Sequence, residues 1–329
     1  METDLERGAR IIIEHWMDVR SGDAVLIITE EAHVDEMHVV KEHAIAMGAN
    51  VAIELLPSDG SQLSQFLCHL TNSMCDYDVI IGATHYSMIT TKAVQQAVKG
   101  GSRFLSLPLS TNDGRSLLEY GFLTMDTDKS KFVAKEFLKH INQSNHLLVT
   151  TLAGTHINIY KVGRNGNYFN GKAKDGNGFA SSSFEVYIPI EEHRTEGIVI
   201  LDGSLGYLGK MKQPFQIRFE GGRLVEIAPT PCGEKLVNYI ENFNDEKMYH
   251  ATEFGIGTNF YSRCSGNSYI EDESAYGTCH IGFGRNIALG GAFEAAGHFD
   301  LVFLKPTIYA DNRMIMENGN MIPIVQEIW

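Results

Sequence analysis

Ala24-Val25-Leu26-Ile27-Ile28 is a short apolar run, and Ser21-Gly22-Asp23 bounds it on the amino-terminal side. Such a run, flanked by turn residues, is typical of a buried strand. A segment with helical spacing follows at residues 34–47 and stops at Gly48, and a second strand candidate occupies residues 51–56. A strand, a helix and another strand in this order indicate a parallel sheet that is covered by helices.

The same alternation continues through the amino-terminal part of the chain. Helical spacing covers residues 6–19 and 90–98, and strands are predicted at residues 79–82 and 104–109. We therefore predict an α/β domain with a mostly parallel sheet over residues 1–148. No GxGxxG motif follows the first strand and no Walker sequence is present, so nucleotide binding is not favoured.

Strand patterns predominate in the remainder of the chain. The strand candidates lie at residues 147–152, 157–160, 185–190, 198–201, 215–219, 301–304 and 307–309. Gly221-Gly222 predicts a hairpin turn, and residues 234–242 have the pattern of a helix. We predict an α+β domain with an antiparallel sheet over residues 149–329, and this sheet carries the residues that could bind a metal.

The composition excludes several classes of protein. The chain has 329 residues and a formal net charge of −14, which disfavours nucleic-acid binding because that function depends on Lys and Arg. No apolar run approaches the roughly 18 residues of a membrane span. The amino terminus lacks the basic and apolar regions of a signal peptide, so a cytoplasmic location is expected. The cysteines form no CxxC pair, which predicts reduced thiols.

Residues with metal-ligand chemistry occur mainly in the last quarter of the chain. His298 and Asp300 are two apart in a strand-like run, so their side chains share one face. Glu253 and His280 lie in Gly-rich frames, which we interpret as turns that approach a metal closely. Glu185, an acid in an apolar strand, is a fifth candidate. This set suits Zn, Mn or Co, as a pair of ions bridged by a carboxylate and water.

Each of these residues also has a structural interpretation. A histidine in a strand is more often a hydrogen-bonded core or surface residue than a ligand, and Glu185 could face solvent. The Gly-rich frames could be simple turns. Arg285 follows His280 by five residues, and Lys172 and Lys174 lie in the Gly-rich loop 171–178. These cations could bind a substrate carboxylate or phosphate, although both lysines also fit solvated positions.

At these residues the chain resembles the aminopeptidase T family of metallopeptidases and their relatives, the 2,5-dihydroxypyridine dioxygenases. The resemblance covers most of the chain and is strongest over residues 184–319. It includes Thr195-Glu196-Gly197-Ile198-Val199-Ile200-Leu201-Asp202-Gly203 and Phe254-Gly255-Ile256-Gly257-Thr258-Asn259. The peptidase pattern implies a site for two metal ions. Its ligand positions correspond here to Glu185, Glu253, His280, His298 and Asp300.

The dioxygenase pattern implies instead a single iron held by two His and one Asp, with the first His at position 253. This chain has Glu253 there, and it has Glu185 and His280 where the dioxygenases have apolar residues. These departures favour hydrolysis over ring-cleaving oxygenation. The peptidases carry a Tyr about seven residues after the ligand that corresponds to His280, whereas this chain has Ile287. A small cyclic amide or cyclic 1,3-diketone is therefore an alternative to a peptide substrate.

We expect a divalent-metal-dependent hydrolase with two Zn, Mn or Co ions per chain, in which metal-activated water attacks a carbonyl. Glu185 or Glu253 is the expected general base, and Arg285 the expected substrate anchor. The alternatives are a ring-opening hydrolase of non-peptide substrates and a mononuclear Fe(II) dioxygenase. A further alternative is a binding domain without catalysis, which would be favoured if the purified protein contained no metal. The expected partner is a small molecule or short peptide, with no nucleic acid or membrane, and the resemblance implies a homodimer.

Overall fold

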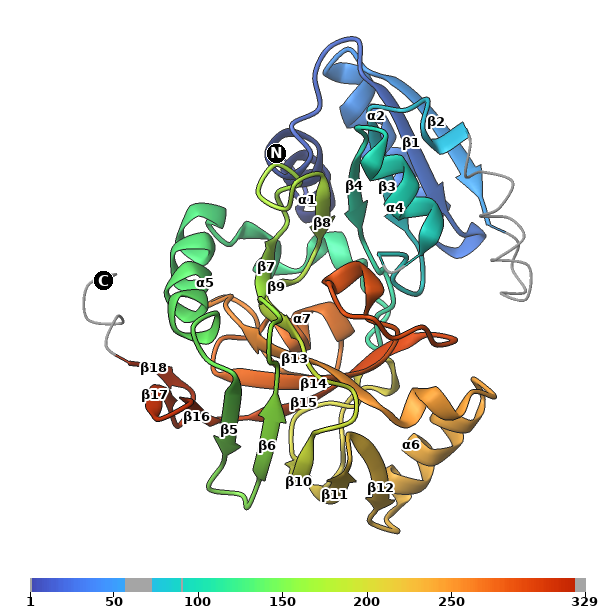
Figure 1. The fold of residues 1–329 in the computed structure, drawn as a ribbon. Helices are drawn as coiled ribbons and strands as arrows, with labels where there is room; N and C mark the ends of the chain where they lie inside the picture. Colours follow the sequence, from blue (N-terminus) through green and yellow to red (C-terminus); the bar gives the residue numbers. More distant parts are fainter. Residues whose placement is uncertain (1, 57–72, 90, 323–329) are drawn as a thin grey trace. The chain divides into compact units, whose positions relative to one another are not determined.

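The computed structural model describes residues 2–56, 73–89 and 91–322. Two residues used in the sequence predictions lie outside this range: Cys68, one of the predicted thiols, and Thr90, the first residue of the predicted helix 90–98. The chain forms two compact units (Figure 1). The first unit comprises Met1–Thr127 and Phe169–Ser183, and the second comprises Asp128–Tyr168 and Phe184–Trp329. Residues 148 and 149, between which the sequence predicts a domain boundary, lie within one strand of the second unit. The assignment of domain limits at that point stays a prediction.

A five-stranded parallel sheet organises the first unit, in the order β2-β1-β3-β4-β8. Its strands are β1 (Ala24–Thr29), β2 (Asn50–Leu55), β3 (Val79–Ala83), β4 (Arg103–Ser106) and β8 (Phe179–Ser181). The first four arise from the predicted apolar runs, so the parallel sheet is confirmed. The fifth strand comes from a later segment of the chain that the sequence pattern did not indicate.

Helices connect these strands. They are α1 (Asp4–Arg10), the π-helical η1 (Ile11–Trp16), η2 (Glu31–His33), α2 (Val34–Ala46), α4 (Lys92–Lys99), η3 (Leu117–Glu119) and η4 (Gly121–Thr124). The predicted helix at residues 6–19 is thus an α-helix that continues as a π-helix. Its start is fixed by a capping box, in which the side chains of Thr3 and Glu6 each bind the backbone N–H of the other residue.

The second unit contains two antiparallel sheets. The larger has the order β12-β11-β10-β6-β5-β16-β17-β18, and the smaller has the order β15-β14-β13-β9-β7. The larger sheet comprises β5 (His146–Thr150), β6 (His156–Tyr160), β10 (Glu196–Leu201), β11 (Phe215–Glu220), β12 (Arg223–Ile227), β16 (Thr307–Ala310), β17 (Arg313–Glu317) and β18 (Asn320–Met321). The smaller comprises β7 (Asn167–Asn170), of which only residues 167 and 168 belong to the second unit, together with β9 (Phe184–Pro189), β13 (Ala251–Gly257), β14 (Thr278–Gly284) and β15 (His298–Leu304).

The predicted α+β architecture with an antiparallel sheet is confirmed. The predicted hairpin turn joins β11 to β12, and both of its glycines have positive φ, 55° at Gly221 and 76° at Gly222. The helical and 3₁₀ segments of this unit are α5 (Thr127–Ile141), η5 (Gly206–Leu208), α6 (Pro231–Glu241), η6 (Glu246–Tyr249), α7 (Tyr269–Ser274) and η7 (Ile287–Leu289). Among the described residues, no helix has the length and apolar character needed to cross a bilayer.

One hydrophobic core joins the two sheets of the second unit. Val199 contributes from the larger sheet, and Phe254 and Ile281 contribute from the smaller one. Phe137 of α5 and Leu236 of α6 complete the same core. Burying such side chains removes apolar surface from water and stabilises the unit by roughly 1.5–3 kcal/mol for each large residue. The smaller sheet therefore has one apolar face, which leaves its opposite face for other chemistry.

Candidate metal centre

All five predicted metal ligands lie on the face of the smaller sheet that points away from the core. Successive side chains of a strand point to opposite faces. Phe254 and Ile281 enter the core, so their neighbours Glu253 and His280 point the other way. The same alternation applies to β15, where Leu301 is in the core and Asp300 is not. The ligand candidates on this face are Glu185 of β9, Glu253 of β13, His280 of β14, and His298 and Asp300 of β15.

A β-bulge at Thr252 determines which way Glu253 points. Ala251 pairs with Phe283, whereas Glu253 pairs with Gly282, so Thr252 is an extra residue on β13. Ala251 belongs to the core, and without the bulge a residue two positions later would also face the core. The extra residue reverses this relation and places the Glu253 carboxylate among the other ligand candidates. Bulges commonly redirect side chains beside active sites.

Two glycines make room for the ligand side chains. The backbone of Gly255 pairs with that of His280, and a methyl group on Gly255 would lie 1.8 Å from Nε2 of His280. Gly282 lies between Glu253 and Asp300, and a methyl group there would lie 2.7 Å from Oδ1 of Asp300. The imidazole and the carboxylates thus occupy the space above strand positions that have no side chain.

These glycines correct one expectation from the sequence. Glu253 and His280 were predicted to lie in Gly-flanked turns, but they lie in the middle of β13 and β14. The prediction was wrong because the glycines serve to accommodate neighbouring side chains and do not bend the chain. His298 and Asp300 were predicted to share one face of a strand, and β15 confirms this.

The five side chains form two groups that share Glu253. Glu185, Glu253 and His280 form one group, and Glu253, His298 and Asp300 form the other. Within each group the ligand atoms lie within 4.8 Å of one another. Nε2 of His280 is 2.9 Å from Oε2 of Glu185, and Nε2 of His298 is 3.0 Å from Oε2 of Glu253 and 3.4 Å from Oδ1 of Asp300.

The arrangement around His298 fits a metal ligand. Its Nδ1 is 3.0 Å from the carbonyl oxygen of Arg285, so a proton on Nδ1 can be donated to that carbonyl. The neutral ring then presents Nε2 as an acceptor, on the side of Glu253 and Asp300. Histidines that bind metals usually donate their other ring N–H to a carbonyl or carboxylate in this way.

Burial and charge strongly perturb the protonation of the two histidines. Burial acts to lower the pKa of His280, but its hydrogen bond to Glu185 and the charges of the carboxylates outweigh burial and raise the pKa to about 9. Burial also acts to lower the pKa of His298, but the carboxylates of Asp300 and Glu253 outweigh this effect and raise the pKa well above its ordinary value. Without a metal, the two imidazoliums therefore act as the counterions of the buried acids.

The carboxylates show the complementary effects. Burial is the main cause that raises the pKa of Glu253, and the charges of Asp300 and Glu185 add to it. Burial also acts to raise the pKa of Asp300, but the positive charge of His298, whose Nε2 is 3.4 Å from Oδ1, lowers it overall. Like charges confined in a buried space are costly unless a cation lies between them.

The residues of this cluster suit a divalent ion for two reasons. They have the atom types that bind such ions, and some of their buried polar atoms have no hydrogen-bond partner among the described residues. Nδ1 of His280 and Oδ1 of Asp300 are buried and have no hydrogen-bond partner among the described residues. Buried polar atoms of native proteins almost always have a partner, so these atoms point to a group that binds there. Imidazole nitrogens together with carboxylate oxygens suit Zn, Mn, Co or Fe. The residues of this face therefore fit a divalent metal, whose identity and number stay predictions.

Two residues of this cluster were missed in the sequence. Glu273 of α7 is 3% exposed, and burial together with the charges of Glu185, Asp300 and Glu253 raises its pKa well above the ordinary value. Tyr269, at the start of the same helix, donates a hydrogen bond from its hydroxyl to Oδ2 of Asp300. The only sequence signal was a run of acids, residues 271–273, which usually indicates a solvated surface.

The predicted cations lie apart from the ligand cluster or contact it only indirectly. The guanidinium of Arg285 donates to the carbonyl of Ala296 (3.3 Å), and within the described residues it bonds to none of the five ligand candidates. Arg285 reaches the centre through its carbonyl oxygen, which holds His298. Its predicted role as a substrate anchor stays a prediction.

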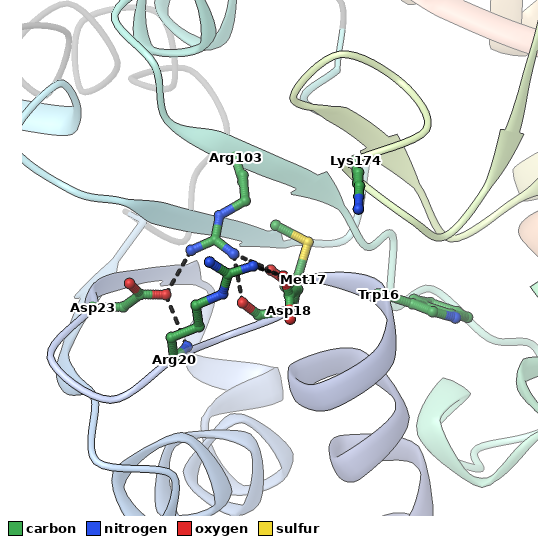
Figure 2. A pocket seen from close by; sticks show the side chains of 7 residues that line it. All are labelled: Trp16, Met17, Asp18, Arg20, Asp23, Arg103 and Lys174. Atoms are coloured by element: carbon green, nitrogen blue, oxygen red, sulfur yellow. Dashed lines mark hydrogen bonds and ion pairs between the residues drawn. The ribbon is translucent and has the colours of Figure 1, made fainter.

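Lys172 and Lys174 belong to the first unit. Lys174 lines a pocket of about 320 Å³ together with Arg20, Asp23 and Arg103 (Figure 2). Most of the hydrogen-bonding capacity of Arg103 is already used, because it binds the carbonyls of Met17 (2.7 Å) and Asp18 (2.6 Å) and the carboxylate of Asp23 (2.5 Å). The main role of this arginine is thus to join the end of η1 to the start of β1.

The profile of the 2,5-dihydroxypyridine 5,6-dioxygenase (NicX) family matches residues 15–323. The chain belongs to this family. A solved 2,5-dihydroxypyridine dioxygenase from Pseudomonas putida KT2440 has a TM-score of 0.81 with this member at 16% identity, with 98% of each chain covered. AmpT from Thermus thermophilus has a TM-score of 0.66 at 15% identity, with 97% of this chain and 99% of that chain covered.

Both parts of the predicted resemblance are confirmed at the level of fold. At identities of 15–16% a structural match shows the fold alone. The search of curated protein sequences found no match to this chain. Because the chain belongs to a family of enzymes, we take it to be an enzyme. The reaction must be argued from the site itself, because one fold can support different reactions.

Proposed function

We propose that the chain is a divalent-metal-dependent hydrolase that acts on a carbonyl compound and uses two metal ions. The observation that carries this proposal is the presence of Glu253 in both ligand groups. A carboxylate shared by two groups is the usual bridge in a two-ion centre. A single ion held by the group of Glu253, His298 and Asp300 would need neither Glu185 nor His280, both of which are buried on the same face.

Divalent ions in such a centre lower the pKa of water toward neutrality and polarise a substrate carbonyl. The five side chains would hold these ions, and Glu253 belongs to both ligand groups. Glu185 is then the carboxylate best placed to act as general base, since it belongs to one group only. It accepts a proton from water as the water oxygen bonds to the carbonyl carbon, and it returns the proton to the leaving nitrogen or carbon as the bond to the carbonyl carbon breaks.

The substrate class that we propose is a small amide or diketone, either a short peptide or a ring. A peptide substrate is supported by the fold shared with AmpT. A ring substrate is supported by the segment after His280, where the chain has Arg285 and Ile287 in place of the aromatic residue of the peptidase pattern. The expected products distinguish them, because ring opening yields one product and peptide cleavage yields two.

The second candidate is an Fe(II) dioxygenase. It is supported by the family profile and by the TM-score of 0.81 with the Pseudomonas enzyme. The dioxygenase pattern has its first histidine ligand at position 253, so a single iron would here take the group of Glu253, His298 and Asp300, an imidazole with two carboxylates. This candidate gives Glu185 and His280 no role, and for that reason we rank it second.

The deciding experiment is metal analysis of protein purified from medium that contains Zn, Mn and Fe, followed by activity assays. We expect two Zn or Mn ions per chain and hydrolysis of short peptides, cyclic amides or cyclic 1,3-diketones without oxygen uptake. One iron per chain with oxygen consumption on dihydroxypyridines would establish the second candidate instead. Absence of any retained metal would support a binding domain and contradict both.

Two substitutions sharpen this test. Glu185→Ala and His280→Ala should each lower the metal content and reduce hydrolysis by roughly 100-fold or more, as expected for loss of a group that acts on the transition state. The matched controls are Glu317→Ala and His156→Ala, which alter exposed residues on other strands. If Glu185→Ala and His280→Ala both retained full metal content and activity, the two-ion proposal would be wrong.

A further inference from the structure

The short helix α7 lies against the ligand face of the smaller sheet. It contacts β9, β13, β14 and β15 (Figure 1). All six of its side chains are buried, although three of them are acidic. Burial of acids is costly unless they have partners. The buried acids of α7 therefore need partners, which a helix that only covered an apolar surface would not.

Side-chain hydrogen bonds of Asp272 and Ser274 hold α7 in place. The carboxylate of Asp272 accepts from the backbone N–H groups of Ser265 (2.8 Å) and Gly266 (2.9 Å). The hydroxyl of Ser274, the last residue of the helix, accepts from the backbone N–H of Phe184 (2.9 Å), the residue before Glu185. The helix is thus fixed to the strand that carries one of the ligand candidates, and its side chains have defined positions.

Tyr269 is the residue of α7 that meets Asp300. Its hydroxyl donates a hydrogen bond to Oδ2 of Asp300. Its ring stacks on that of Tyr207, with ring centroids 4.3 Å apart and an interplanar angle of 21°. Tyr269 is 6% exposed, so neither contact is open to exchange with bulk water.

The two oxygens of Asp300 therefore have different environments. Oδ2 is held by Tyr269, whereas Oδ1 has no hydrogen bond among the described residues and faces Nε2 of His298 at 3.4 Å. A carboxylate that is free to rotate could offer either oxygen or both to an ion. A hydrogen bond to one oxygen fixes the plane of the group and leaves the other as a single ligand atom.

We propose that Tyr269 is a positioning residue of the metal centre, whose hydroxyl holds Oδ2 of Asp300 so that Oδ1 is presented to a divalent ion. The inference rests on the proposed function, because it assumes that Asp300 binds a metal. It assigns Tyr269 no contact with substrate. Groups that hold metal ligands in this way typically contribute about 10–100-fold to metal affinity.

The test compares Tyr269→Phe with the wild-type protein, and Tyr276→Phe is the matched control. Tyr276 also has a hydroxyl in a single described hydrogen bond, to the backbone N–H of Met321 (2.9 Å), and it lies outside the ligand cluster. Affinity for Zn²⁺ is measured by competition with a chelating dye, and the visible spectrum is recorded after loading with Co²⁺. Thermal unfolding of the metal-free proteins reports stability separately.

We expect Tyr269→Phe to bind Zn²⁺ about 10–100-fold more weakly and to alter the Co²⁺ spectrum. Tyr276→Phe should leave both measurements unchanged. Equal affinity and an identical Co²⁺ spectrum for Tyr269→Phe and the wild type would overturn the inference, even if stability fell. If the wild-type protein bound neither ion, the proposed function would fail first, and this outcome is distinguishable from failure of the inference alone.

Discussion

At the level of single residues, Gly255 and Gly282 determine whether the ligand side chains fit. His280 reaches toward Glu185 across the backbone of Gly255, and Asp300 and Glu253 lie on either side of Gly282. A side chain at either glycine would compete with an imidazole or a carboxylate for the same space. The capacity of this face to hold a metal therefore depends on two residues that have no ligand atoms.

Replacing Gly255 by Ala should displace His280. The new methyl group would lie 1.8 Å from Nε2 of His280, so the ring must move away from its position beside Glu185. We expect Gly255→Ala to weaken metal binding by roughly ten-fold or more, and overpacking to lower the free energy of unfolding by about 1–3 kcal/mol. Calorimetric titration with Zn²⁺ and thermal unfolding measure the two effects.

Gly121→Ala provides the control for that substitution, because a methyl group at Gly121 would meet no atom within 4 Å. It should leave both quantities near their wild-type values. Metal binding by Gly255→Ala that equals that of the wild type would show that His280 does not need its present position.

The sequence was sufficient to find the five ligand candidates but not the residues that support them. His298 and Asp300 were recognisable from their spacing, and Glu185 was recognisable as an acid in an apolar strand. Tyr269 and Glu273 were missed because their helix has no apolar stripe and is buried on nearly all sides. The carboxylates and backbone groups that offset its polar side chains come from distant segments of the chain, so local sequence does not reveal them.

At the level of elements, the segment between β14 and β15 determines where His298 lies. Asn286 anchors this segment, and its side-chain amide donates to Glu192 (3.0 Å) and to the carbonyl of Thr252 (2.9 Å). Its side-chain oxygen accepts from the backbone N–H of Phe293 (2.9 Å). The segment also supplies the carbonyl that holds His298, so its anchoring bears on the metal centre.

Removing the Asn286 side chain should destabilise the fold. Asn286→Ala leaves buried partners without their hydrogen bonds, and we expect the free energy of unfolding to fall by about 2–3 kcal/mol. Denaturant titration monitored by circular dichroism measures this loss. The exposed Asn320→Ala is the control and should change stability by less than about 0.5 kcal/mol. Similar effects of the two substitutions would mean that the anchor is not important for stability.

The elements differ in how well local sequence predicted them. Strands β1, β3 and β10 were found because short β-branched apolar runs that end at turn residues rarely form anything but buried strands. Strands β13 and β14 were taken for loops because their glycines alternate with apolar residues. Helix α5 was overlooked although its buried positions 133, 134, 137, 138 and 141 have helical spacing.

At the level of the whole molecule, the path of the chain is harder to infer than its parts. The chain enters the second unit at residue 128, returns to the first at 169 and leaves it again at 184. The returning segment supplies β8, which pairs with β4. A pattern read along the sequence shows where strands lie, but not which sheet a short strand joins, because pairing depends on residues that are distant in sequence.

The stability of the metal-free protein should depend on pH through the buried histidines. The pKa of His280 is raised to about 9 in the folded chain, above its ordinary value of 6.5. A group with a raised pKa stabilises the fold fully below its unfolded value, and this contribution is lost as the pH rises through the folded value. We therefore expect the thermal unfolding midpoint in the presence of chelator to fall between pH 6.5 and about 9.

The raised pKa values of His298 and Glu253 act in the same direction, whereas the lowered pKa of Asp300 acts only at acidic pH. Metal-loaded protein is the control, because a metal replaces the protons and its ligands must be deprotonated to bind it. Its midpoint should not show the same fall. A metal-free midpoint that rises across this range would contradict the protonation states described above.

The bulge at Thr252 has a consequence for how such a site can change during evolution. Because the bulge sets the orientation of position 253, any residue substituted there keeps its side chain on the ligand face. A histidine at position 253 would thus point to the same face as Glu253. Loss of one residue between 251 and 253 would instead turn that position toward the apolar layer. The chemistry of this face can diverge by substitution, provided that the number of residues in β13 is kept.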